Sequence, residues 1–134
     1  MSQKVLDVGQ CNADHARITE FLTNEFDVEV TRAHSFDEAI KLAMDSPFDV
    51  ILINRVVDAD KSDGMAILHE LKSQPSTAEV PIMIVSNFQE AQDMAVESGG
   101  VRGFGKAALD DPATRDTLGA FLVALPKRPN GDDR

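Results

Sequence analysis

The sequence lacks several residue types that would point to particular functions. It has neither tryptophan nor tyrosine, so few aromatic side chains are present on which nucleic-acid bases could stack. Its 13 basic residues are outnumbered by 23 acidic ones, and the net charge of −10 would repel a phosphate backbone. The largest basic cluster is the pair Lys127-Arg128. These absences argue against nucleic-acid binding.

Two further absences concern location. No run of about 18 apolar residues is present, so we expect no membrane span, and the N-terminus lacks the basic and apolar blocks of a secretory signal. The single cysteine, Cys11, excludes an internal disulfide framework and suits a reducing cytoplasm. We expect a cytoplasmic protein with one domain over residues 1–125 and a polar, disordered tail over 126–134.

Apolar patterning predicts a fivefold alternation of strand and helix. FDVILI and VPIMIV are almost wholly apolar, as expected of strands buried on both faces of a parallel sheet. Helix starts are predicted at Asn12, at the capping box Ser35–Glu38, at Asp63 and at Asp111-Pro112. The last helix should bury residues up to Leu125. The predicted strands cover residues 4–8, 28–31, 48–53, 80–85 and 101–104. The expected fold class is α/β, with a doubly wound parallel sheet.

In such sheets, function is found at the carboxyl ends of the strands. The residues at those ends are Gly9, Gln10, Asn54, Ser86, Asn87 and Lys106.

Four segments give the sequence a resemblance to the response-regulator receiver (CheY-like) family over residues 3–125. They are KVLDVGQCNADH, FDVILINRVV, DGMAILHELKSQPSTAEVPIMIVS and GVRGFGK. The resemblance implies a flavodoxin-like (βα)5 domain with five parallel strands in the order 2-1-3-4-5. It also implies a phosphorylation site built from an acidic pair, an acceptor aspartate, a hydroxyl residue and a lysine. The matching residues here are Gly9 and Gln10, Asn54, Ser86 and Lys106.

The first three of these positions have lost their carboxylates. An aspartyl phosphate needs a carboxylate nucleophile, and Mg²⁺ needs hard anionic oxygens, so we expect neither phosphorylation of Asn54 nor magnesium binding. The loop NRVVDADKSDG is about two residues longer than the family's and lacks its proline. Ala107 stands where the family usually has proline, so we expect a trans bond there and a reshaped loop that turns Lys106 elsewhere. The resemblance is thus to a degenerate, or pseudo-receiver, form with no metal, cofactor or enzyme activity.

Several residues carry alternative interpretations. Asn54 is expected either to hydrogen-bond Ser86 or Lys106 in a fixed pocket, or to be a plain polar strand end. Asp7, inside a predicted strand, is either a replacement acid for the pocket or a salt-bridged structural acid. Phe104 matches the position of the family's switch aromatic. It is expected either to be held in one rotamer there or to be an ordinary residue of the hydrophobic core.

Other polar residues have simpler expectations. The cluster Asp58, Asp60 and Asp63 matches a cation loop poorly and is expected to be a solvated acidic loop. His15, His34 and His69 lack metal-ligand spacing and are expected on the surface.

The functional hypothesis is a stand-alone receiver domain in two-component signalling that binds a protein in trans, another protein or a second copy, independently of phosphorylation. By family analogy, the partner face includes Met94 and Arg102. One alternative is a phosphorelay receiver with an unorthodox acceptor such as Asp58. The other is an unrelated flavodoxin-like ligand-binding protein.

Overall fold

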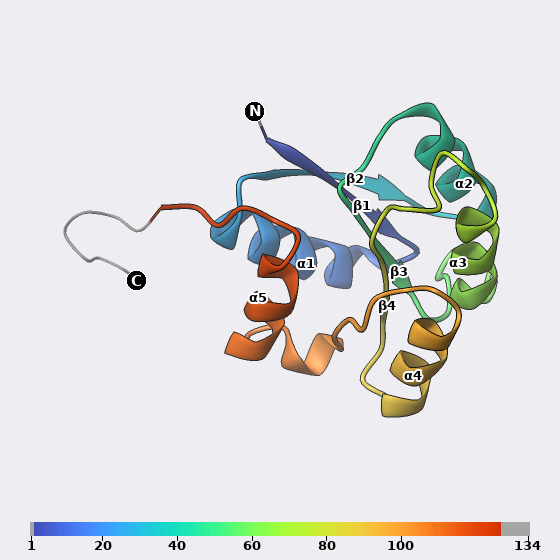
Figure 1. Cartoon of the computed structure of the whole chain (residues 1–134). Helices are drawn as coiled ribbons and strands as arrows, with labels where there is room; N and C mark the ends of the chain where they lie inside the picture. Colours follow the sequence, from blue (N-terminus) through green and yellow to red (C-terminus); the bar gives the residue numbers. More distant parts are fainter. Residues whose placement is uncertain (1, 127–134) are drawn as a thin grey trace.

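The computed structural model describes residues 2–126, and all but the first residue of the predicted tail lie outside this range. Strands and helices alternate along the chain (Figure 1). The strands are β1 (Gln3–Val8), β2 (Val28–Ala33), β3 (Val50–Asn54) and β4 (Ile82–Val85). The helices are α1 (Asn12–Glu25), α2 (Phe36–Asp45), α3 (Gly64–Lys72), α4 (Gln89–Glu97), the short 3₁₀ helix η1 (Lys106–Ala108) and α5 (Pro112–Gly119).

The four strands form a parallel sheet in the order β2-β1-β3-β4. Helices cover both faces, as the sequence predicted. One core cluster packs α2 and α3 against Leu6, Ile51 and Ile53, while the other packs α1 and α5 against Val5 and Leu52. No helix within residues 2–126 is both long and apolar enough to cross a membrane.

The prediction of a fifth strand over residues 101–104 is wrong for this structure. Val101 N–H donates to the Ile82 carbonyl and Ser86 N–H to the Phe104 carbonyl, so the segment lies beside β4. Between these two bonds, however, the regular ladder is interrupted by a side chain from α4. Gln92 accepts from Gly103 N–H at 2.7 Å and donates to the Ile84 carbonyl at 2.9 Å. An amide therefore stands where a backbone hydrogen bond would complete the strand.

Most of the predicted helix starts are confirmed. Ser35, Asp63 and Asp111 each accept a backbone N–H in the first turn of α2, α3 and α5. Asn12 is not a cap, because it is already helical and its side chain accepts from Arg32.

The predicted burial of Leu125 is also wrong. Helix α5 ends at Gly119, and the following chain bonds to the residues around Phe26, which leaves Leu125 41% exposed.

Candidate functional site

The carboxyl ends of β1 and β3 meet at Gly9. Gly9 has a φ of +80°, a left-handed conformation that favours glycine, and its N–H donates to the Ala33 carbonyl of β2. The Gly9 carbonyl accepts two hydrogen bonds, from Asn54 Nδ2 at 3.1 Å and from Asp58 N–H at 2.9 Å. The backbone of the predicted acidic-pair position is thereby tied to the predicted acceptor position.

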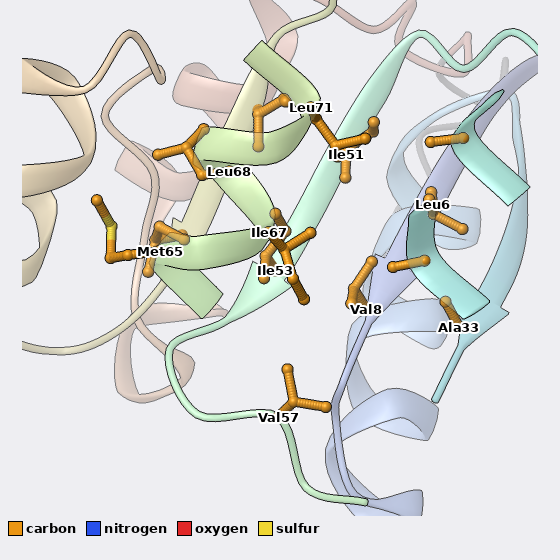
Figure 2. Packing of buried hydrophobic residues seen from close by; sticks show 14 of the residues in the cluster. Leu6, Val8, Ala33, Ile51, Ile53, Val57, Met65, Ile67, Leu68 and Leu71 are labelled. Atoms are coloured by element: carbon orange, nitrogen blue, oxygen red, sulfur yellow. The ribbon is translucent and has the colours of Figure 1, made fainter. Parts of the chain in front are cut away.

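Val57 fills the space above Gly9. Its side chain is completely buried, and a Cβ at Gly9 would lie 3.1 Å from a Val57 methyl carbon. Figure 2 shows Val57 on the loop after β3, near Val8 and Ile53, with which it shares a core cluster. The hydrophobic core therefore extends past the end of the sheet as far as Gly9, one of the two predicted acidic-pair positions.

The loop between β3 and α3 is held in this closed position at both ends. Gly64 N–H donates to the Arg55 carbonyl, and Val57 pairs with Ser62 through its own N–H. Lys61 adopts a left-handed φ of 59° and donates its N–H back to the Val57 carbonyl. The insertion seen in the sequence thus makes a compact turn that presses Val57 onto β1.

The acidic residues of this loop have structural partners. Asp63 caps α3 and pairs with Arg55, while Asp60 accepts N–H bonds from Phe36 and Ser62. The Ser62 hydroxyl also donates to Asp60 at 2.7 Å. Together these bonds lower the pKa of Asp60, and the bond from the Ser62 hydroxyl contributes most. Within residues 2–126, no three histidine, cysteine or acidic side chains converge in a way that could hold a metal ion.

The remaining predicted site residues do not meet at Asn54. Ser86 Oγ accepts from Phe88 N–H at 3.1 Å, and Lys106 Nζ lies 2.8 Å from Asp14 Oδ2 on α1. The expected bond from Asn54 to Ser86 or Lys106 is therefore replaced by the bond to Gly9. The Lys106 ammonium lowers the pKa of Asp14 by direct hydrogen bonding.

Around Lys106, the expected trans bond to Ala107 is present, since every described peptide bond is trans. Phe104 is 6% exposed and belongs to the core cluster of α1 and α5, in agreement with the core interpretation.

Asp7 forms a buried pair that the sequence analysis missed. Its carboxylate is completely buried and faces α1, where Oδ2 lies 2.7 Å from His15 Nδ1. Burial raises the pKa of Asp7, against the opposing influence of His15, Gln10 and Arg32. Asp7 is thus a structural acid, and His15 is half-buried instead of exposed. The eight-residue spacing between a strand and the next helix is the one signal that could have suggested the pair.

Gln10 makes no side-chain hydrogen bond to Gly9 or Asn54. It is 3% exposed, its carbonyl accepts from Arg32, and both of its side-chain amide atoms lack a hydrogen-bond partner among the described residues. Of the five predicted pocket residues, the structure brings together only Gly9 and Asn54.

A groove lies on the other side of the β4 end. It has a volume of about 380 Å³ and runs between the start of α4, residues 102–105 and the start of α5. Its lining includes Ser86, Phe88, Gln92, Arg102, Phe104 and Asp111. We call it the α4 groove. Phe88 is 72% exposed at this groove, so a large apolar ring faces solvent there.

No family model and no curated protein matches this chain. Solved structures do match, and three of them are response regulators or their receiver domains. The receiver domain of a DNA-binding response regulator from Colwellia psychrerythraea has a TM-score of 0.75 at 23% identity, covering 89% of this chain and 97% of that one. The Mn²⁺-bound response regulator Rcp1 has a TM-score of 0.71 at 20% identity, covering 92% and 99%. The chemotaxis response regulator CheY4 of Vibrio cholerae has a TM-score of 0.68 at 21% identity, covering 86% and 98%.

At these identities the likeness establishes the fold. The chain has the CheY-like receiver fold, with four assigned strands in the order 2-1-3-4.

Proposed function

We propose that this chain is a receiver-like signalling module that binds a protein partner and is not itself phosphorylated. The observation that carries the proposal is Val57, which is completely buried against Gly9 at the end of β1. A carboxylate side chain at Gly9, which the family's metal site needs, would have to displace this apolar side chain from the core. Displacing it would lose the favourable burial of that side chain.

The chemistry of the surrounding groups supports the same conclusion. Asn54 is a neutral amide engaged with the Gly9 carbonyl, and Lys106 is engaged with Asp14. Mg²⁺ is held by hard anionic oxygens, and a carboxylate is needed to form an acyl phosphate. Gly9, Gln10 and Asn54, the positions that match the family's acidic pair and acceptor, supply neither.

The α4 groove is the surface we propose for partner binding. Phe88 exposes most of its ring there, and α4 also exposes Met94 (46%) and Val96 (43%). Met94 and Val96 do not line the groove itself, but exposed aromatic and methionine side chains are typical of protein–protein interfaces. Arg102 lies at the same groove but is already paired with Asp93, which leaves the apolar side chains as the principal anchors.

Phosphorylation is tested by incubating the chain with Mg²⁺ and acetyl phosphate and recording its intact mass. We expect no gain of a phosphoryl group, and an unchanged amide spectrum when beryllofluoride replaces the donor. A conventional receiver domain in the same buffer is the positive control. A phosphorylated product, whether at Asn54 or at Asp58, would overturn the proposal.

Partner binding is tested by affinity capture with three forms of the chain. The native chain and a Val123→Ala control should retain the same bound protein, because Val123 is exposed but outside the α4 groove. Phe88→Ala should lose it, and Mg²⁺ with acetyl phosphate should make no difference. Equal capture by the native chain and Phe88→Ala would reject the α4 groove as the binding surface.

A further inference from the structure

Gln92 interrupts the pairing between β4 and the segment that runs beside it. This segment follows α4 and continues to η1 (Figure 1). Its first and last bonds to β4 are direct backbone bonds, Val101 N–H to Ile82 and Ser86 N–H to Phe104. Because a parallel ladder repeats every two residues, the next direct bond after Val101–Ile82 would join Gly103 N–H to the Ile84 carbonyl.

That bond is replaced by two bonds through one side chain. Gln92 Oε1 accepts from Gly103 N–H at 2.7 Å, and Gln92 Nε2 donates to Ile84 at 2.9 Å and to the Ser86 carbonyl at 3.1 Å. Gln92 is 5% exposed, so the amide is fixed inside the protein. A side-chain amide matches the backbone because it carries both a donor and an acceptor.

The two backbone segments are nevertheless already close. A Cβ at Gly103 would lie 2.9 Å from the Ile84 carbonyl oxygen and 2.9 Å from the Met83 Cβ. Glycine is therefore required at this position. A regular fifth strand in this register would also move the Ser86 N–H bond from the Phe104 carbonyl to the Gly103 carbonyl. Buried backbone groups that lose one partner must find another, because an unpaired N–H or C=O inside a protein is costly.

We propose that Gln92 is a conformational latch: with its amide inserted, Gly103 N–H is kept from the Ile84 carbonyl, and with its amide withdrawn residues 101–104 pair with β4 as a regular fifth strand. Gln92, Gly103 and Phe104 all line the α4 groove, so closure changes the shape of that groove. The latch concerns the backbone pairing alone and does not depend on whether a partner binds there.

The test uses hydrogen-bond scalar couplings, which long-range HNCO spectra of the labelled chain record directly. In the native chain we expect a coupling from Gly103 N to Gln92 Cδ. In Gln92→Leu, which cannot bridge, we expect a coupling from Gly103 N to the Ile84 carbonyl carbon instead. Gln89→Leu is the matched control, because Gln89 is exposed on the same helix, and it should keep the native pattern.

Two results would overturn the latch. One is a Gly103–Ile84 coupling already present in the native chain, which would mean that the fifth strand is formed. The other is a folded Gln92 variant without that coupling, which would show that removing the amide does not let the fifth strand form. If Gln92→Leu does not fold, Gln92→Ala serves the same purpose.

Discussion

Val57 shows how a single apolar side chain can extend the core beyond the end of a sheet. It lies next to Val56 in the sequence, yet Val57 is completely buried and Val56 is 51% exposed. The difference arises because the loop turns back through the Val57–Ser62 bond and directs only one of the two side chains onto Gly9. At this scale, Gly9 offers no carboxylate and is covered by an apolar side chain.

This pair of valines provides a controlled stability test. Val57→Ala removes buried methyl groups and should lower the free energy of unfolding by about 2 kcal/mol. Val56→Ala should change it by less than about 0.5 kcal/mol, because the side chain is already half in solvent. Urea unfolding measures both. Equal effects of the two substitutions would show that Val57 does not have the buried role described above.

The buried carboxyl group of Asp7 leads to a second prediction, which concerns how the free energy of unfolding depends on pH. Burial raises the pKa of Asp7 above its ordinary 3.8, so the folded state binds this proton more tightly than the unfolded state does. Its favourable contribution is complete below the unfolded value and is lost as the pH rises through the folded one. Relative to Asp7→Asn, the native chain should therefore lose stability between acidic and neutral pH.

The measurement is a series of urea unfolding curves of both forms across that pH range. His15→Gln is a useful companion, because it removes the partner that opposes the rise in pKa. With His15 absent, the difference in stability between the chain with Asp7 and its Asp7→Asn variant should fall over a wider pH range and by a larger total amount. A difference that grows as the pH rises would contradict the assignment of Asp7 as an acid whose pKa is raised by burial.

At the scale of elements, α3 begins unusually close to the end of β3. A Cβ at Gly64 would lie 2.2 Å from the Asn54 carbonyl oxygen, and Gly64 N–H donates to the neighbouring Arg55 carbonyl. This contact sets where the intervening loop starts and ends. The position of Val57 over Gly9 therefore depends on a glycine at the first residue of α3.

Gly64→Ala should disrupt this arrangement. The added methyl group must push the β3 end and α3 apart, at a cost of about 1–3 kcal/mol in unfolding free energy. Gly119→Ala is the control, since no atom lies within 4 Å of a Cβ at the last residue of α5. Alanine there should be neutral or stabilise by about 0.5–1 kcal/mol. Thermal or urea unfolding distinguishes the two, and an undiminished stability of Gly64→Ala would be inconsistent with the close approach.

For the whole molecule, the dominant electrostatic feature is the net charge of −10. Mutual repulsion of this size destabilises the folded chain, and dissolved ions screen it. A cation that bound a specific site would add stabilisation that depends on its own concentration. Because Gly9 and Asn54 offer no carboxylate at the strand ends, Mg²⁺ should act through screening alone.

The melting temperature should accordingly rise with salt, and Mg²⁺ and Na⁺ should raise it equally at matched ionic strength. Differential scanning fluorimetry over a concentration series of each salt makes the comparison. A saturable increase seen with Mg²⁺ and not with Na⁺ would indicate a metal site and would argue against the proposed function.

Much of the fold could be read from local sequence. The apolar runs around Val50–Ile53 and Ile82–Val85 lie in buried strands, and Ser35, Asp63 and Asp111 begin helices where predicted. These features depend on neighbours a few residues apart, which is why periodicity and capping residues report them. The absence of the expected carboxylates at Gly9, Gln10 and Asn54 is likewise a property of the sequence alone.

The features that distinguish the site were decided by contacts between distant residues. Val57 meets Gly9, Lys106 turns to Asp14, and Gln92 takes the place of a backbone bond between Ile84 and Gly103. Each depends on how a loop or helix is positioned once the sheet has formed, which local patterns do not encode. The sequence by itself determined an α/β chain without carboxylates at Gly9, Gln10 and Asn54. Tertiary packing decided that the core would extend over Gly9 and that residues 101–104 would not form a regular fifth strand.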